Sequence, residues 1–300
     1  MRQERRPGDV RRGLTPTAPA PRIWHGLCRL LKSRGAAFGL VVVLSIAIVA
    51  LLAPAVAPYN PVRQNLFHQN EPPTAAHWLG TDRLGRDILS RTVWGARLSL
   101  VTGLGSILIG AIQGSTLGLT AGYYGGRVDA VIARVVDTLL AFPLYLSAIF
   151  VIAVLGPSQL GVVLAVGIAV TPVFARLARG DAMEEREKEY VLAARAVGNT
   201  SLRVIVTHIL PNIIAPLIVL ASLSLGDAIL VEAGLSFLGL GPPPPTPAWG
   251  LMVNDGMVVL TRAPWVSMGP GIAIALLVLG SNLLGDGLRD AFDPRLRGSL

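Results

Sequence analysis

The stretch DAMEEREKEYVLAARAVGNTSLRVIVTHILPN, residues 181–212, is a charged segment between two apolar stretches near 160–175 and 213–233. A helix that crosses the hydrocarbon core of a bilayer needs about 20 predominantly apolar residues. Ionised side chains are costly in that core, because they lose their hydration there. The pattern therefore predicts two membrane-spanning helices joined by a polar segment outside the bilayer.

Within this segment the residues predict two short helices. Asp181 stands where a helix N-cap is expected, and the residues after it favour a helix. Gly198 tolerates the left-handed conformation with which helices commonly end. Thr200 or Ser201 can cap a second, shorter helix, which we expect Pro211 to end. The segment is thus predicted to form two helices joined by a glycine elbow.

The composition of the whole chain indicates an integral membrane protein. Hydrophobic residues make up 52% of the 300 residues and charged residues only 15%, against about 25% charged in a soluble domain. The net charge of +8 does not indicate nucleic-acid binding, because the aromatic and fold signals for it are missing. We predict an all-α polytopic fold with about six spanning helices, at about 38–57, 98–122, 134–155, 160–175, 213–233 and 268–285.

The distribution of Lys and Arg predicts the orientation. With both termini cytoplasmic, the inner segments hold 20 of the 26 Lys and Arg residues and the outer segments hold 6. Cytoplasmic segments of membrane proteins are enriched in these residues. Five of the outer arginines lie in one segment, where Asp82 and Asp87 can offset some of them. These arginines are Arg63, Arg83, Arg86, Arg91 and Arg97.

The chain divides by composition into four parts. Residues 1–36 form a basic, cytoplasmic tail that we expect to be disordered, and 37–97 hold the first helix and an external segment. Residues 98–290 form the transmembrane core, which includes the polar segment 181–211. Residues 291–300 form a cytoplasmic C-terminal tail.

Four glycines recur at every fourth position of the second predicted helix. This spacing places them on one helix face, where small residues let another helix approach closely. Whether that helix belongs to the same chain or to another subunit stays open. The four residues are Gly110, Gly114, Gly118 and Gly122.

The sequence lacks the common signatures of catalysis. The only lysines, Lys32 and Lys188, do not complete a G-x-x-x-x-G-K-[ST] phosphate-binding loop, and no serine stands in G-x-S-x-G. The four histidines lack metal-ligand spacing, and the single cysteine, Cys28, excludes an internal disulfide. We therefore predict that the chain is not an enzyme and binds no metal or cofactor.

Four acidic residues lie in or near the predicted spans: Asp137, Asp227, Glu232 and Asp286. They are either a proton relay or substrate ligands, or else hydrogen-bonding groups that face the bundle or a water-filled path, and we favour the second interpretation. Asp137 stands three residues after Arg134, with which it could form a local ion pair.

The segment 181–211 resembles the EAA loop of ATP-binding cassette importer permeases. That loop has the pattern E-A-A-x3-G, followed nine or ten residues later by a hydrophobic residue, Leu and Pro. Leu192 occupies the usual glutamate position, and Glu189, one helical turn earlier, is a candidate substitute. The matching residues are Ala193, Ala194, Gly198, Ile209, Leu210 and Pro211.

Six further strings, in family order, are similar to the dipeptide/oligopeptide/nickel permease family, and most of all to its C-type subunit. The resemblance covers about residues 36–297 and implies the type I ABC importer permease (MetI-like) fold. The strings are HWLGTDRLGRDILSR (77–91), AGYYGGRVD (121–129), VDTLLAFP (136–143), EAGLSFLGLG (232–241), PTPAWG (245–250) and NLLGDGLRDAFDPRLR (282–297).

The resemblance implies an assembly in the bacterial inner membrane. A second, homologous permease would pair with this chain as a heterodimer, and two ATPase subunits would dock below the pair. The EAA-type loop of this chain would sit in a groove on one ATPase, and a substrate-binding protein would deliver cargo from outside. ATP and Mg²⁺ would be bound by the ATPases. The cargo implied is most often a di- or oligopeptide, with nickel chelates and glutathione as alternatives.

Other classes of protein remain as alternatives. An ion-coupled secondary transporter could use Asp227 and Glu232 to move protons, but such carriers often contain inverted repeats with interrupted helices, and the sequence contains no convincing repeat. A membrane enzyme is disfavoured by the missing signatures. A scaffold without transport would leave the EAA-like loop unexplained.

Overall fold

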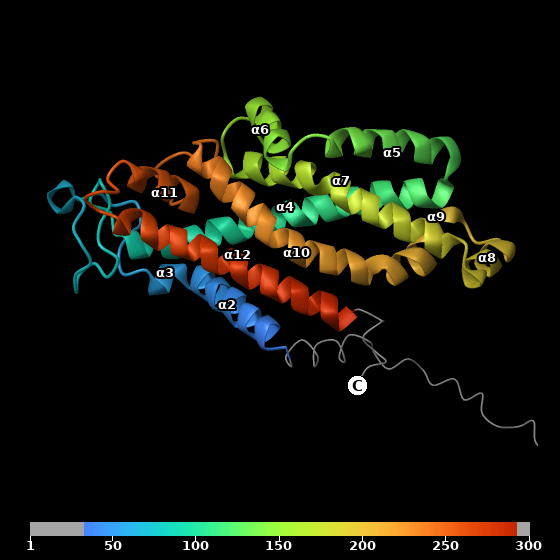
Figure 1. Ribbon diagram of the computed structural model, residues 1–300, viewed down its shortest axis with the longest axis horizontal. Coiled ribbons are helices and arrows are strands. Elements are labelled where there is room, and N and C mark those ends of the chain that lie inside the picture. The colour runs from blue at the N-terminus through green and yellow to red at the C-terminus, as the bar shows by residue number, and fades with distance from the viewer. Residues whose placement is uncertain (1–32, 293–300) are drawn as a thin grey trace, which may run out of the picture.

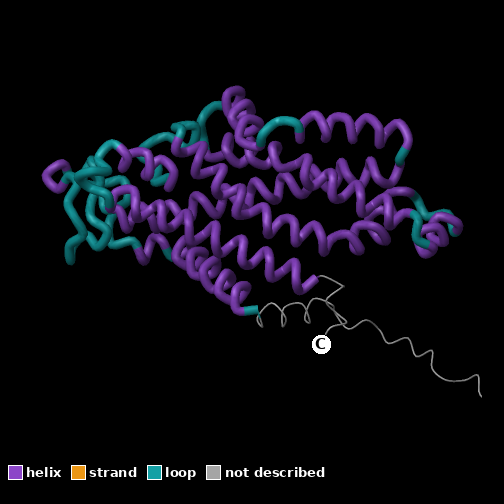
Figure 2. Tube along the Cα trace, viewed as in Figure 1, coloured by secondary structure: helices purple, strands orange, loops and turns teal. Residues whose placement is uncertain are grey.

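The computed structural model describes residues 33–292, which form helices and loops without a named strand. Figure 1 shows the long helices lying side by side as one bundle. Figure 2 shows that most of the loops lie at the two ends of this bundle. The helices are α2 (Arg34–Leu51), α3 (Ala53–Val56), η1 (Leu66–His68), α4 (Ile88–Tyr124), α5 (Gly126–Leu140), α6 (Leu144–Leu155), α7 (Gln159–Arg186), α8 (Glu189–Ala196), α9 (Ser201–Val204), η2 (Ile205–Ile209), α10 (Leu210–Phe237), α11 (Trp249–Met257) and α12 (Trp265–Phe292).

Five helical stretches are long and apolar enough to cross a membrane. A sixth span results if the bent pair α5 and α6 is counted as one. About six spans were predicted, and this number is confirmed. The five stretches are Arg34–Leu51, Ile88–Tyr124, Gln159–Arg186, Ser201–Phe237 and Trp265–Ala291.

The single helix expected over 134–155 is wrong. The chain bends by 96° between α5 and α6. The break falls at 141–143, where Pro143 lacks a backbone N–H and disfavours helical geometry at Phe142. Composition could not reveal this break, because the residues on both sides of it are apolar.

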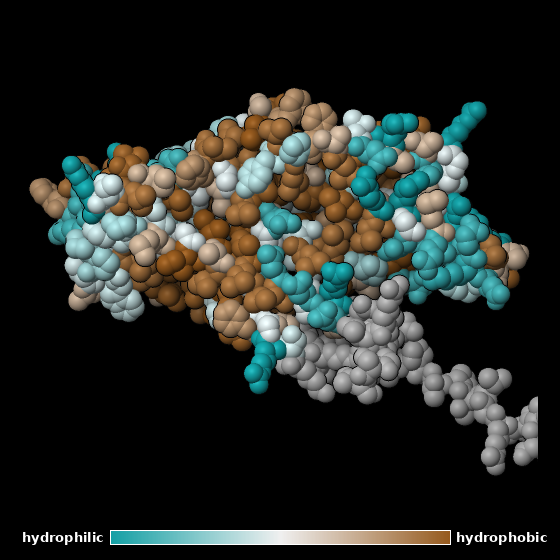
Figure 3. Space-filling model, viewed as in Figure 1, coloured by the Kyte–Doolittle hydropathy of each residue, from teal (hydrophilic) through white to brown (hydrophobic). Residues whose placement is uncertain are grey.

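The surface follows the pattern expected in a bilayer. Brown, hydrophobic residues cover the middle of the face shown in Figure 3, while teal, hydrophilic residues gather around α8 and on the loops at the opposite end. Large apolar side chains such as Leu108, Ile112 and Phe150 are more than half exposed. The N-terminal end of α2 and the C-terminal end of α12 point toward the end that carries α8 (Figure 1).

The glycine face of α4 packs against α7 of the same chain. A Cβ atom at Gly114 would lie 2.4 Å from the carbonyl oxygen of Thr171 and 2.5 Å from the Cβ of Phe174. The other three glycines meet α7 in the same way: Gly110 at Gly167 and Val170, Gly118 at Ala175 and Ala178, and Gly122 at Arg179 and Ala182. Since packing rather than hydrophobicity joins helices in lipid, this close approach holds the centre of the bundle.

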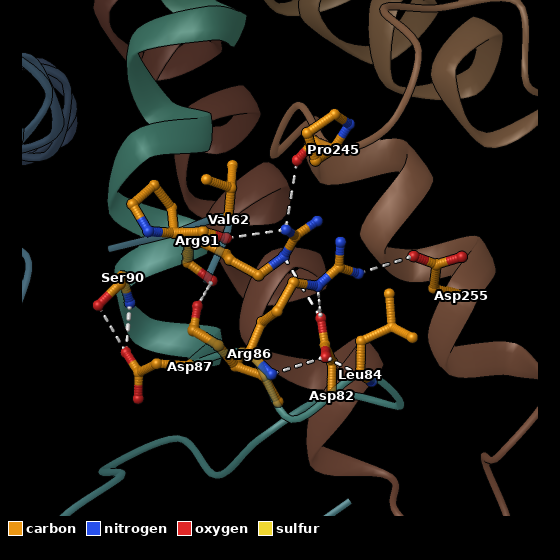
Figure 4. A network of polar contacts seen from close by, with 12 residues as sticks. Val62, Asp82, Leu84, Arg86, Asp87, Ser90, Arg91, Pro245 and Asp255 are labelled. Carbon is orange, nitrogen blue, oxygen red and sulfur yellow. Dashed lines mark hydrogen bonds and ion pairs between the residues drawn. The ribbon is translucent and has the colours of Figure 1, made fainter. Parts of the chain in front are cut away.

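At the end opposite α8, buried ion pairs join the start of α4 to the segment before it and to α11 (Figure 4). Asp82 contacts Arg86 at 2.6 Å and Arg91 at 3.5 Å, and Arg86 also approaches Asp255 at 3.6 Å. Arg91 is only 1% exposed and donates to the carbonyl of Pro61 at 3.0 Å. Arg86 and Arg91, two of the five arginines of the predicted outer segment, therefore have structural partners.

Asp87 has a different role from the one expected. It caps α4 by accepting hydrogen bonds of 2.7 Å from the backbone N–H and the hydroxyl of Ser90 (Figure 4). Its other oxygen contacts His77 at 2.8 Å. The contacts of Asp87 thus hold the start of α4, and the charge of the arginines is balanced by Asp82 and Asp255 instead.

Candidate functional site: the segment between α7 and α10

The segment that resembles the EAA loop begins later than predicted. Asp181 does not cap a helix, because α7 continues through it to Arg186. The backbone breaks at Glu187, and Lys188 has extended geometry before α8 begins at Glu189. The residues from Ala182 to Arg186 are good helix formers, so the preceding span simply extends beyond the apolar region.

The predicted glycine elbow follows α8. Gly198 has φ +84°. Its N–H donates to the carbonyl of Arg195 at 2.9 Å, and the N–H of Asn199 donates to the carbonyl of Ala194 at 3.2 Å. This pair of bonds is a Schellman motif, in which glycine accepts the left-handed conformation at little cost. The elbow therefore satisfies the last carbonyls of α8 and turns the chain.

After the elbow, the helix continues into the membrane. Thr200 is the N-cap of α9, without a side-chain hydrogen bond, and α9, η2 and α10 form one stretch from Ser201 to Phe237. The prediction that Pro211 ends the second helix is wrong. The π-helical turn η2, closed by the bond from the N–H of Leu210 to the carbonyl of Ile205, lies directly before Pro211. The wider turn accommodates a proline that lacks an N–H.

A cluster of polar side chains joins the end of α7 to α8 and α10. The carboxylate of Glu185 accepts hydrogen bonds from Lys188 at 2.6 Å and from the hydroxyl of Tyr190. Asn212 donates to Tyr190 at 3.1 Å and to the carbonyl of His208 at 2.6 Å. Burial and the bond to Glu185 raise the pKa of Tyr190 to about 12, and the bond to Glu185 also raises the pKa of Lys188.

A second contact joins α8 to the end of α4. The guanidinium of Arg195 lies 4.6 Å from the centre of the Tyr123 ring, and its Nε donates to the Tyr123 hydroxyl at 3.2 Å. Cation–π contacts of this kind add about 0.5–1 kcal/mol at exposed sites. On α7, Arg186 donates to the carbonyl of Gly122 at 2.9 Å. Side-chain contacts thus attach the segment to the three spanning helices α4, α7 and α10.

The structure divides the predicted docking residues into two groups. Ala194 and Ile209 are buried, at 7% and 0% exposure, and pack in the hydrophobic core. Leu210 is half-buried. The exposed residues are Glu189, Leu192, Ala193, Gly198 and Pro211.

Two exposed apolar residues were missed. Val197 is 80% exposed and Leu202 is 71% exposed, on either side of the elbow. With Leu192, at 46%, they are exposed apolar side chains of α8, the elbow and α9, and we call these three residues the tip surface. The available signal was an apolar residue directly before Gly198, at the expected end of a polar-side helix. The exposure of Val197 depends on the orientation of α8, which the sequence does not show.

The comparison with protein families decides what this fold is. The sequence model described as "Binding-protein-dependent transport system inner membrane component" matches residues 114–298. The chain belongs to this family. A second model, the N-terminal transmembrane domain of oligopeptide transport permease C, matches residues 22–73. The chain is thus an ABC importer permease and a multi-pass protein of the cytoplasmic membrane.

Characterised relatives span almost the whole permease. A dipeptide transport system permease, DppC, from Alkalihalophilus pseudofirmus is 45% identical over 90% of this chain and 88% of its own length. The di/tripeptide permease DppC of Pseudomonas aeruginosa is 44% identical over 94% of both chains. The glutathione permease GsiD of Pectobacterium atrosepticum is 47% identical over 87% of both.

A solved structure has the same fold. A chain of the MetNI methionine ABC transporter, in inward-facing conformations, matches with a TM-score of 0.54 and 17% identity over 69% of the permease and 97% of its own length. The MetI-like fold implied by the sequence is thereby confirmed. Permeases of this family are transport channels rather than catalysts, and the family works with ATPase subunits and a substrate-binding protein.

Among the four acidic residues, two have protein partners. Glu232 is 1% exposed and accepts hydrogen bonds of 2.9 Å from Ser99 and from Ser236, so it joins α4 to α10. Asp137 pairs with Arg176 of α7 at 2.8 Å, and not with Arg134 as expected. The local pair is replaced because α7 lies directly beside α5.

The remaining two acids are exposed. Asp286 lies on the exposed side of α12, and Asp227 borders a cavity beside α10.

Proposed function

We propose that this permease forms one half of the translocation pathway of an ATP-driven importer for dipeptides and short oligopeptides. A second, homologous permease completes the pathway as a heterodimer. Two ATPase subunits hold the ATP and Mg²⁺, and one of them docks on the tip surface. A substrate-binding protein delivers the cargo at the opposite end. The permease itself binds no cofactor.

The tip surface supports the docking proposal. An exposed apolar patch outside the lipid region favours a protein partner. Leu192 replaces the glutamate usual at this position of the EAA loop, so the contact here is apolar rather than ionic. The polar cluster around Glu185 and the Arg195–Tyr123 contact attach the tip surface firmly to the spans. A displacement of the tip surface by the ATPase is therefore transmitted to α7 and α10.

The relatives support the cargo. The observation that carries it is the identity of 44–45% to permeases named for dipeptides or di- and tripeptides over at least 90% of this chain. Glutathione is the second candidate, because a glutathione permease is 47% identical. All of these cargoes are short peptides with a free amino group, so the two candidates differ in the length and charge of the cargo.

Uptake by reconstituted vesicles tests the function. The complete complex, with its binding protein, is placed in proteoliposomes, and uptake of labelled dipeptide and of labelled glutathione is measured with and without ATP inside. We expect ATP-dependent dipeptide uptake that a protonophore does not change. Uptake that persists without ATP and stops with the protonophore would instead support a proton-coupled carrier.

Crosslinking tests the docking surface separately. In a Cys28→Ser background, Val197→Cys introduces a thiol at the tip surface, and Val258→Cys introduces one at a comparably exposed valine (68%) after α11. We expect crosslinks to an ATPase subunit from position 197 and none from position 258. Labelling of position 197 from outside the cell would contradict the docking proposal.

A further inference from the structure

A cavity of about 330 Å³ lies beside the bend between α5 and α6. Its walls are α7, α10 and the α5–α6 junction, including Leu140, Val173 and Leu223. Nine of its eleven lining residues are apolar, and the two polar ones are Ser224 and Asp227 of α10. The volume falls within the range of about 300–1,000 Å³ typical of small-molecule sites.

Among the described residues that line this cavity, Asp227 supplies the only ionisable group. Within residues 33–292 its carboxylate has no hydrogen-bond or ion-pair partner, whereas Glu232, just over one turn later, has two hydroxyl donors. A carboxylate inside a spanning helix is costly unless it faces water or a cation. The exposed carboxylate and the adjoining cavity therefore provide a place for a cationic group that the described residues do not supply.

We infer that Asp227 is a cargo-binding residue, which attracts the N-terminal ammonium group of a peptide as it passes through the cavity. This inference rests on the proposed function, because the cation comes from the cargo. Every dipeptide carries this ammonium whatever its side chains, and glutathione carries one too. The single carboxylate recognises the constant group, and the apolar walls accept variable side chains.

The chemistry also sets the direction of the cargo. The C-terminal carboxylate of the peptide is repelled by Asp227, so the ammonium end lies against α10 and Ser224. One charge-assisted contact is enough to orient a peptide but leaves it free to depart. That balance suits a transport pathway, in which binding must be favourable and still reversible.

The test uses the complete complex in proteoliposomes with excess binding protein loaded with alanyl-phenylalanine. Asp227→Asn keeps the size of the side chain and removes its charge, and Asp227→Glu keeps the charge. A matched control, Asp286→Asn, removes an exposed acid of α12 that lies outside the cavity. Three quantities are measured: maximal dipeptide uptake, ATP hydrolysis stimulated by the binding protein, and copurification of the second permease.

We expect Asp227→Asn to lower uptake about tenfold or more, since a hydrogen bond to a charged group contributes about 1.5–3 kcal/mol. ATP hydrolysis and copurification stay at the wild-type level, Asp227→Glu retains most of the uptake, and Asp286→Asn behaves as wild type. This separation of uptake from hydrolysis is the signature of a cargo contact.

Three results would overturn the inference alone. Unchanged uptake by Asp227→Asn would show that the charge is not used. A joint loss of uptake, hydrolysis and copurification would show that Asp227 pairs with the second permease. An equal loss in Asp286→Asn would show a general effect of charge. If the wild-type complex takes up no dipeptide, the proposed function fails first, and the inference fails with it.

Discussion

Replacing Gly114 by alanine inserts a methyl group where α4 and α7 are closest. The new Cβ would lie 2.4 Å from the carbonyl oxygen of Thr171, about 1 Å short of the 3.4 Å at which ordinary van der Waals contact begins. It would also lie 2.5 Å from the Cβ of Phe174 and 2.9 Å from the backbone nitrogen of Ala175. None of these atoms can rotate away, so the two helices must separate.

The expected cost follows from these contacts. Overpacking costs about 1–3 kcal/mol. We expect Gly114→Ala at the upper end of this range, because two of the three nearest atoms belong to the backbone of α7 and cannot move aside. Alanine regains about 1 kcal/mol of helix propensity. We therefore expect a net loss of about 2 kcal/mol in the free energy of unfolding.

Chemical unfolding of the purified permease in mild detergent, followed by tryptophan fluorescence, measures this loss. The matched control is Gly180→Ala on α7, where a Cβ meets nothing within 4 Å. The control should be neutral or slightly stabilising, by up to about 1 kcal/mol. If Gly114→Ala were as stable as Gly180→Ala, the close packing of α4 on α7 would not hold the bundle.

Three further predictions concern the two ends of the bundle. The phenol of Tyr190 should titrate near pH 12 in absorbance spectra, and Glu185→Gln should lower its pKa toward 10. Because the pKa of Tyr190 is higher in the folded than in the unfolded state, the neutral phenol stabilises the fold fully below pH 10. This contribution to stability is lost as the pH rises through about 12. Asp82→Asn should lower the free energy of unfolding by about 3–5 kcal/mol, because it leaves the buried guanidiniums of Arg86 and Arg91 without the acid that they share. Asp255→Asn should lower it by less, since the side chain of Asp255 is 37% exposed. Equal losses for the two variants in thermal melts would contradict this order. Gly198→Arg should leave the permease inserted but abolish ATP-driven uptake, because φ is +84° there and the position lies on the docking side; normal uptake would argue against the coupling role.

The features that were predictable from the sequence are local ones. Apolar stretches of sufficient length indicate spans wherever they occur, and their number predicts an all-α polytopic protein. The MetI-like fold came from the family resemblance. The glycine elbow was also predictable, since the left-handed conformation at position 198 depends mainly on the residue that occupies it. The ends of the spans were not, because α7 and the α10 stretch extend into charged sequence that composition assigns to a loop.

The site was predictable only in part for the same reason. The EAA-like pattern located the segment, but it grouped Ala194 and Ile209, which are buried, with Ala193, which is exposed. Neighbouring residues of an α-helix are rotated by about 100° around its axis, so one can be buried while the next is exposed. The rotation of α8 is set by its contacts with Glu185 of α7 and Tyr123 of α4. Such contacts join residues far apart in the chain, where no local pattern reports them.

The sequence by itself determined the membrane class, the order of the spans and the place of the elbow, because hydropathy and backbone preference act over a few residues. The distribution of Lys and Arg predicts the orientation. The tertiary structure alone decided that the glycines of α4 meet α7 and that Asp82 pairs with both Arg86 and Arg91. It also decided that Asp227 borders a cavity while Glu232 is buried. Each of these depends on how helices rotate and pair, and packing between distant segments selects that arrangement.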